Sequence, residues 1–124
     1  MSHTIYKVYN AQGLIYVGRT NQPLTSRLRG HFFDKPFHSK LDITDVTKIV
    51  YAELPTTADM YVYEIYYINR DKPLLNRSDK ANDALTVELP DLQWTPYEWR
   101  LKSKWEKAIS ETRMRRLLLD SNQA

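Results

Sequence analysis

The sequence predicts a small α+β domain of mixed α/β type, with helices flanking a three-stranded antiparallel sheet and an amphipathic helix near the C-terminal end. Two neighbouring β-rich segments, 4–9 and 14–18, are separated by a turn. Three later segments, near 23–33, 58–70 and 95–119, have the character of helices. One more β-rich segment, 47–54, lies between the first two of these. A chain of 124 residues has the length of one domain.

The first two strands are predicted to form a hairpin. Segment 4–9 (TIYKVY) alternates and is rich in β-formers, and segment 14–18 (LIYVG) has the same character. Asn10-Ala11-Gln12-Gly13 between them has the residue types of a turn. We therefore expect the two strands to pair antiparallel.

A helix is predicted from near Pro23 to about Phe33, since Leu24, Leu28 and Phe32 follow one another at i, i+4 and i+8. Residues 47–54 (TKIVYAEL) are the predicted third strand.

The second predicted helix spans residues 58–70. Thr56-Thr57-Ala58-Asp59 resembles a capping box at its start, and Asp71-Lys72-Pro73 is expected to stop it. Residues 77–93 show no periodicity and are predicted to be a polar loop.

A third helix is predicted to begin at Thr95-Pro96-Tyr97-Glu98, with Thr as N-cap, Pro at the first position and Glu at the third. It is expected to reach about Leu119, with an apolar stripe through Leu101, Trp105 and Ile109. The predicted organisation is a core over residues 1–77, with a linker and a basic helix over residues 78–124 packed on the same domain.

Composition excludes several classes of protein. The chain has no cysteine, which excludes disulfides and thiolate zinc sites. It has no apolar run near the ~20 residues that a membrane span needs. The N-terminal MSHTIYKVYN lacks the apolar region of a signal peptide. We therefore expect a cytoplasmic protein with no membrane partner.

Positive charge is concentrated in two blocks. Residues 1–33 carry Lys and Arg but no Asp or Glu, and residues 97–119 carry seven basic and three acidic residues. The segment between them is net acidic. Two basic blocks in one small domain favour a polyanionic partner, although an ordinary solvated surface has the same pattern.

Candidate catalytic side chains lie in three of the predicted elements. Glu64 is the single charge in the tyrosine-rich run 60–68, where a carboxylate is costly unless it is paired or binds a metal. Arg27 and His31 share one helix face, and arginine is suited to hold a phosphate. Tyr6 and Tyr16 lie one on each strand of the hairpin. Taken singly, each feature also fits packing or an exposed helix face.

Taken in their order along the chain, from the N-terminal end, these motifs resemble those of the GIY-YIG nuclease family. Thr4-Ile5-Tyr6 and Tyr16-Val17-Gly18 look like the paired tripeptides that name the family, and Arg27 to His31 looks like its Arg-x-x-x-His segment. Three more elements are similar to family motifs: His38-Ser39, Glu64-Ile65-Tyr66-Tyr67-Ile68 and Asn76. The likeness covers roughly residues 4–77, with Thr4 in place of Gly, Val17 in place of Ile and slightly short spacing between the tripeptides.

The resemblance implies a metal-dependent endonuclease that hydrolyses nucleic-acid phosphodiesters, with DNA as the expected substrate and a phage or mobile element as the expected source. Glu64 would bind Mg²⁺ (or Mn²⁺), Arg27 would hold the phosphate, and Tyr6 would orient or deprotonate the attacking water. Because the free pKa of tyrosine is about 10, a nearby cation is expected to lower the pKa of Tyr6. The expected catalytic residues are Tyr6, Tyr16, Arg27, His31, Glu64 and Asn76. The expected substrate-binding residues are Gly18, Arg19, Arg29, His38, Arg113, Arg115 and Arg116.

Two other readings stay open at this point. The first is an inactive nucleic-acid-binding or regulatory module on the same fold, and the second is a structural domain whose tyrosines only pack. Oligomeric state is also open, because a double-strand cut by one active site needs either a dimer or two visits.

Overall fold

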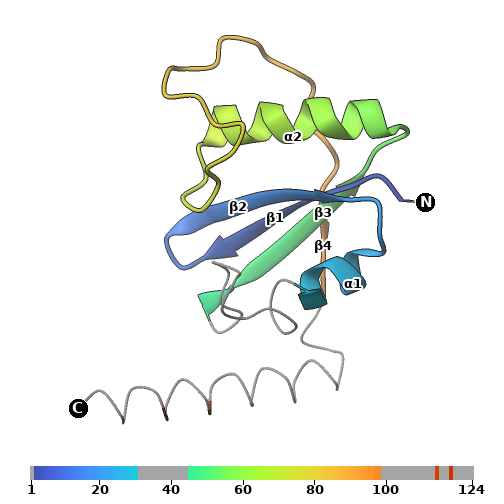
Figure 1. The fold of residues 1–124 in the computed structure, drawn as a ribbon, viewed down its shortest axis with the longest axis vertical. Coiled ribbons are helices and arrows are strands. Elements are labelled where there is room, and N and C mark those ends of the chain that lie inside the picture. Colours follow the sequence, from blue (N-terminus) through green and yellow to red (C-terminus); the bar gives the residue numbers. More distant parts are fainter. Residues whose placement is uncertain (1, 31–44, 99–113, 115–117, 119–124) are drawn as a thin grey trace.

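The computed structural model describes residues 2–30 and 45–98, together with Met114 and Leu118. Four strands form one antiparallel sheet in the order β2-β1-β3-β4. Figure 1 shows helix α2 along one face of this sheet and helix α1 on the other side. The strands are β1 (Thr4–Asn10), β2 (Gly13–Thr20), β3 (Lys48–Glu53) and β4 (Thr95–Pro96), and the helices are α1 (Leu24–Arg29) and α2 (Thr57–Asp71).

The predicted hairpin is confirmed. Strands β1 and β2 pair antiparallel, with Thr4 opposite Thr20 and Tyr6 opposite Gly18. In the turn, the Asn10 side chain accepts a 2.9 Å hydrogen bond from the Gln12 amide. Gly13 has a backbone φ of 127°, which residues with a Cβ atom rarely adopt. The local residue types therefore suffice to form this turn.

The prediction of three strands is wrong, because Thr95–Pro96 forms a fourth strand where a helix was expected to begin. Thr95 lies opposite Tyr51 of β3, and the next amide, that of Tyr97, donates to the Ile49 carbonyl at 2.8 Å. Pro96 is tolerated here because β4 is the last of the four described strands in the sheet, and a missing N–H costs little on the outer side of an edge strand. Of the rest of the predicted helix, the described residues Met114 and Leu118 are helical and exposed.

Helix α2 has the predicted start and end. The Thr56 hydroxyl accepts a 3.0 Å hydrogen bond from the Asp59 amide, as an N-cap does. The helix ends at Asp71, and the C-cap residue Lys72 has a left-handed φ of 48° and precedes Pro73. Helix α1 follows Pro23 as predicted and buries Leu28, while its predicted continuation to Phe33 lies outside the described residues.

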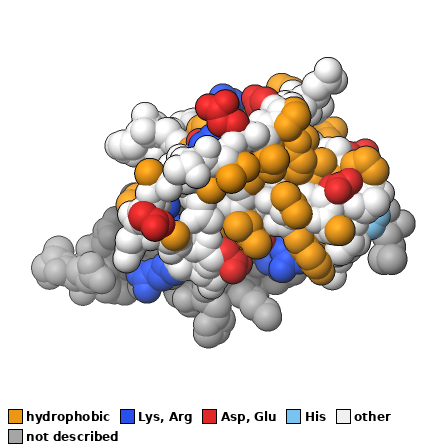
Figure 2. Space-filling model, turned by 90° about the horizontal axis from the view of Figure 1, so that it is seen from above, with side chains coloured by type: hydrophobic (Ala, Val, Ile, Leu, Met, Phe, Trp, Pro, Cys, Tyr) orange, Lys and Arg blue, Asp and Glu red, His pale blue; other side chains and the backbone are white. Residues whose placement is uncertain are grey.

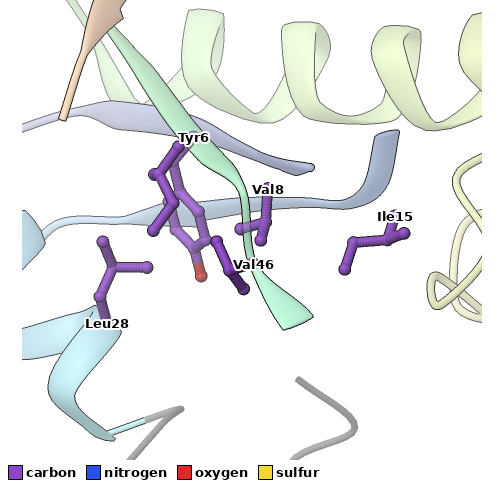
Figure 3. Packing of buried hydrophobic residues seen from close by; sticks show 6 residues of the cluster. Tyr6, Val8, Ile15, Leu28 and Val46 are labelled. Atoms are coloured by element: carbon purple, nitrogen blue, oxygen red, sulfur yellow. The ribbon is translucent and has the colours of Figure 1, made fainter. Parts of the chain in front are cut away.

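Hydrophobic residues form one cluster on each face of the sheet. The cluster on the α1 side includes Val8 of β1 and is shown in Figure 3, where Tyr6 of the same strand lies near Leu28 of α1. Ile15 joins this cluster at a β-bulge, since Val8 pairs with Tyr16 and Tyr9 pairs with Leu14. The cluster on the α2 side consists of Ile5, Val17, Met60, Tyr66, Tyr67 and Ile68.

The loop over residues 77–94 contains no helix or strand, as predicted, and it packs on α2. The Tyr67 hydroxyl donates to the Asp91 carboxylate at 2.5 Å, and the Leu92 amide donates to the same hydroxyl at 3.2 Å. Trp94 at the end of the loop lies 5.3 Å from the Tyr67 ring. The loop thereby covers the part of α2 that carries Tyr67.

Lys7 of β1 is buried beneath this loop. Its ammonium group lies 4.0 Å from the Tyr67 ring centre, 4.5 Å from that of Trp94 and 3.5 Å from the Asp71 carboxylate. Burial lowers the pKa of Lys7, and Asp71 offsets part of that change. Lys7 therefore does not belong to the exposed basic surface that the charge of residues 1–33 suggested.

The outer surface of α2 exposes hydrophobic side chains. Figure 2 looks down on this layer and shows hydrophobic side chains gathered across it. Helix α2 contributes Tyr61, Val62 and Ile65, whose exposed fractions are 44%, 55% and 47%. Within residues 2–30 and 45–98, no helix has the length and apolarity that a membrane crossing requires.

Candidate active site

The two tyrosines of the hairpin meet over Gly18. Tyr6 is opposite Gly18 in the strand register, and its ring centre lies 6.1 Å from that of Tyr16. A Cβ at position 18 would overlap the phenol of Tyr6 and lie 2.8 Å from the Tyr16 ring. Only glycine leaves room for both rings here, so the sequence Tyr16-Val17-Gly18 directly shapes this part of the site.

The electrostatic surroundings of Tyr6 differ from the expectation. The Tyr6 side chain is fully buried, and burial together with the neighbouring Tyr16 raises its pKa far above 10. The Arg27 guanidinium, which hydrogen-bonds Tyr6, lowers the pKa but does not overcome burial. The expectation that nearby cations lower the pKa of Tyr6 overall is therefore wrong for the protein alone, and Tyr6 is a neutral phenol at pH 7.

Glu64 projects from the middle of α2 and is paired with a residue of β2. Its Oε1 atom accepts a hydrogen bond from Arg19 Nε at 2.9 Å, and only 12% of its side chain is exposed. Burial raises the pKa of Glu64, whereas Arg19 lowers it and the charge of Asp79 raises it further. The carboxylate is thus neither an exposed surface group nor an unpaired charge.

Arg19 itself lies against an aromatic ring. Its guanidinium is 4.1 Å from the centre of the exposed Tyr61 ring, and 41% of the Arg19 side chain is accessible. The sequence predicted that Arg19 binds substrate, but it contained no signal that Arg19 pairs with Glu64.

Asn76 takes the place of a neighbouring strand beside β2. Among the described strands β2 lies at the edge of the sheet, so no strand described here pairs with the outward backbone groups of Val17. The Asn76 side chain accepts from the Val17 amide and donates to the Val17 carbonyl, both at 2.9 Å, and the Leu75 amide donates to the Ile15 carbonyl at 2.9 Å. Asn76 is buried and holds the backbone between Tyr16 and Gly18.

Helix α1 supplies the arginines of the predicted site. Arg27 and Arg29 are both exposed, with buried Leu28 between them, and Arg27 is the one that contacts Tyr6. The remaining predicted site residues lie outside the described residues: His31, His38, Arg113, Arg115 and Arg116.

The titratable side chains among the described catalytic candidates interact electrostatically with one another. The charges of Arg27 and Glu64 affect the pKa of both Tyr6 and Tyr16, and the charge of Arg27 affects the pKa of Glu64. Residues from β1, β2, α1 and α2 therefore converge on one place. Asp79, in the loop after Asn76, is an additional charge near Glu64 that the sequence did not single out.

The geometry defines a class of protein: a small α+β domain in which a β-hairpin and two helices bring together a tyrosine pair, an arginine and a partly buried glutamate. The family model of the GIY-YIG catalytic domain matches residues 2–79, well over half of the chain. The chain belongs to this family, which confirms the resemblance and implies nucleic-acid cleavage in general, with nucleic acid as the substrate. No curated protein and no solved structure matches the chain.

Proposed function

We propose that this protein is a metal-dependent endonuclease that hydrolyses DNA phosphodiester bonds with Mg²⁺ or Mn²⁺. The observation that supports the proposal is the convergence of Tyr6, Tyr16, Arg27 and Glu64: the charges of Arg27 and Glu64 act on the pKa of both tyrosines, and the charge of Arg27 acts on that of Glu64. Phosphodiester hydrolysis needs a positioned water, positive charge beside the phosphate and help for the leaving oxygen. These residue types meet the first two needs.

Glu64 is the residue assigned to the metal. Among the described residues, no group of three or more His, Cys, Asp or Glu side chains could hold a metal ion. Mg²⁺ does not need such a group, because it keeps several waters and is commonly held by one or two carboxylates plus substrate phosphates. One partly buried glutamate with Asp79 nearby therefore fits this cation, which would supply Lewis-acid stabilisation of the developing negative charge.

The chain's own side chains supply the remaining chemistry. Arg27 is exposed and reaches the Tyr6 hydroxyl, so it is placed to hold a non-bridging phosphate oxygen beside that hydroxyl. Tyr6 is protonated at neutral pH, so its primary role is to orient the attacking water by hydrogen bonding. It acts as a base only if further positive charge lowers its pKa. Tyr16 orients the same water or the phosphate, and Asn76 positions the strand that carries Tyr16.

The last basic block is proposed to grip the substrate outside this site. Arg113, Arg115 and Arg116 would neutralise backbone phosphates, and each phosphate neutralised contributes about −0.9 to the log–log salt slope on duplex DNA. Replacing the three together with alanine is expected to weaken binding to all sequences and flatten that slope.

The test is a metal-dependent digest of plasmid DNA, single-stranded DNA and RNA, with Glu64→Gln as the key variant. The amide has the same shape as the carboxylate but lacks the charge that a hard cation requires, so we expect at least a ~10²-fold loss of rate at unchanged thermal stability. Glu88→Gln is the matched control, since Glu88 is exposed in the 77–94 loop, and it should cleave as the wild type does. Near-normal turnover of Glu64→Gln with Mg²⁺ would refute the metal assignment. A wild-type protein that binds nucleic acid but cleaves none of the three substrates would favour the inactive binding module.

A further inference from the structure

The carboxylate assigned to the metal already has a cationic partner. Arg19 of β2 and Glu64 of α2 lie 45 positions apart in the sequence and are joined by a 2.9 Å contact between Nε and Oε1. A guanidinium in this position opposes a divalent cation in two ways: it occupies a ligand oxygen, and its positive charge repels the ion. In the protein alone, Arg19 and a metal ion therefore compete for Glu64.

The two partners differ in how far solvent and a ligand can reach them. Glu64 is 12% exposed and fixed on a helix, whereas 41% of the Arg19 side chain is accessible. The Tyr61 side chain holds Arg19 by a hydrogen bond and a 4.1 Å contact with its ring, which is itself 44% exposed, so Arg19 can keep this neighbour at the surface when it leaves Glu64. A guanidinium near the site has a strong alternative partner in a phosphate, to which arginine donates two parallel hydrogen bonds.

We propose that Arg19 is a positioning residue that couples substrate binding to metal binding. It holds Glu64 until a phosphate of the nucleic acid draws the guanidinium away, and the released carboxylate then binds the divalent cation. This inference rests on the proposed assignment of the metal to Glu64. Because either ligand weakens the same ion pair, each one favours binding of the other, and the coupling is reciprocal. An enzyme built in this way takes up its metal preferentially when substrate is present.

The experiment measures Mn²⁺ affinity of the full chain at pH 8 by titration calorimetry, without and with a saturating phosphorothioate oligothymidylate. The backbone of this probe keeps its charge but resists cleavage. Without the probe, Arg19→Met should bind Mn²⁺ about fivefold more tightly than the wild type, the factor expected for loss of one competing, partly exposed ion pair. The probe should raise the affinity of the wild type for Mn²⁺ but leave that of Arg19→Met nearly unchanged.

Two further variants make the result specific. Arg77→Met removes the same charge from an exposed position outside the pair and should bind Mn²⁺ as the wild type does. Arg19→Lys should give an intermediate affinity and replaces Arg19→Met if that variant does not fold. Weaker or unchanged Mn²⁺ binding in Arg19→Met would show that Arg19 supports the metal site or is irrelevant to it, and would overturn the proposal.

Glu64→Gln separates this inference from the proposed function. If Glu64→Gln removes Mn²⁺ binding while Arg19→Met leaves it unchanged, the metal assignment stands and only the coupling fails. If Glu64→Gln binds Mn²⁺ as the wild type does, the metal assignment and the coupling fail together.

Discussion

Replacing Asn76 with alanine should destabilise the protein by an amount that follows from its two contacts. The Asn76 side chain bonds both the amide and the carbonyl of Val17 at 2.9 Å, and Val17 is 1% exposed. A buried backbone group left without a partner costs about 1–3 kcal/mol. Since β2 is an edge strand that water can partly reach, we expect a loss of about 2–4 kcal/mol in the free energy of unfolding for the two groups together. For a domain of this size, that loss lowers Tm by on the order of 10 °C.

The assay is equilibrium unfolding in urea, followed by tryptophan fluorescence, together with amide hydrogen exchange of Val17. Asn82→Ala is the matched control, because Asn82 is exposed in the 77–94 loop and should change the free energy of unfolding by less than about 0.5 kcal/mol. Asn76→Asp keeps the acceptor for the Val17 amide but presents a negative charge to the Val17 carbonyl, so it should be at least as unstable as Asn76→Ala. Cleavage by Asn76→Ala, measured well below its Tm, should also fall, since Tyr16 and Gly18 flank the released strand segment.

The reasoning would be refuted by an Asn76→Ala protein that unfolds at the wild-type urea concentration and still protects the Val17 amide from exchange. That result would mean that the edge of β2 is held by the backbone of the following loop, without the Asn76 side chain.

Three further predictions follow from the same structure. Gly18→Ala should cost about 1–3 kcal/mol of stability and most of the cleavage activity, because its Cβ overlaps two site rings, whereas Gly30→Ala has no atom within 4 Å of its Cβ and should unfold like the wild type. Arg27→Ala should lower the cleavage rate by at least ~10²-fold and Arg29→Ala far less, since the two side chains point about 200° apart on the helix. Equal losses of rate would mean that both arginines contribute only general positive charge and that Arg27 has no specific role. The pKa of Lys7 in the folded protein lies below its ordinary value of 10.5. Between these two pKa values the unfolded chain binds more protons than the folded protein does. The stability of the wild type should therefore rise relative to that of Lys7→Met as the pH increases through this window. Urea unfolding at several pH values tests this last point, and a pH-independent difference between the two proteins would contradict it.

The parts of the fold that the sequence predicted correctly depend on local signals. The hairpin turn needs only a residue that tolerates positive φ and an Asn side chain that bonds two residues ahead, and Gly13 and Asn10 supply these. The start of α2 needs only the Thr56 hydroxyl and the Asp59 amide, three residues apart. Such signals act within one turn of chain and can be read without any knowledge of the rest of the molecule.

The wrong prediction at Thr95 shows where local signals stop. Thr, Pro and Glu in this spacing favour a helix start, but Thr95 and Pro96 pair with β3 instead. Pairing with a strand more than 40 positions earlier depends on where β3 ends up in the sheet, and no local pattern contains that information. Tertiary pairing overrides a propensity that is worth only about 1 kcal/mol.

The candidate site divides in the same way. The sequence by itself identified the family and singled out the tyrosine pair, Arg27 and Glu64 as candidates, because the ordered motifs are short strings of residues. Only the tertiary structure decided that Arg19 pairs with Glu64, because this contact depends on how α2 docks against β2. Likewise, the sequence suggested a lowered pKa for Tyr6 from the charges nearby, whereas the folded core raises it, since burial disfavours the phenolate more than Arg27 favours it. Charges can be counted along a chain, but desolvation is a property of the packed structure.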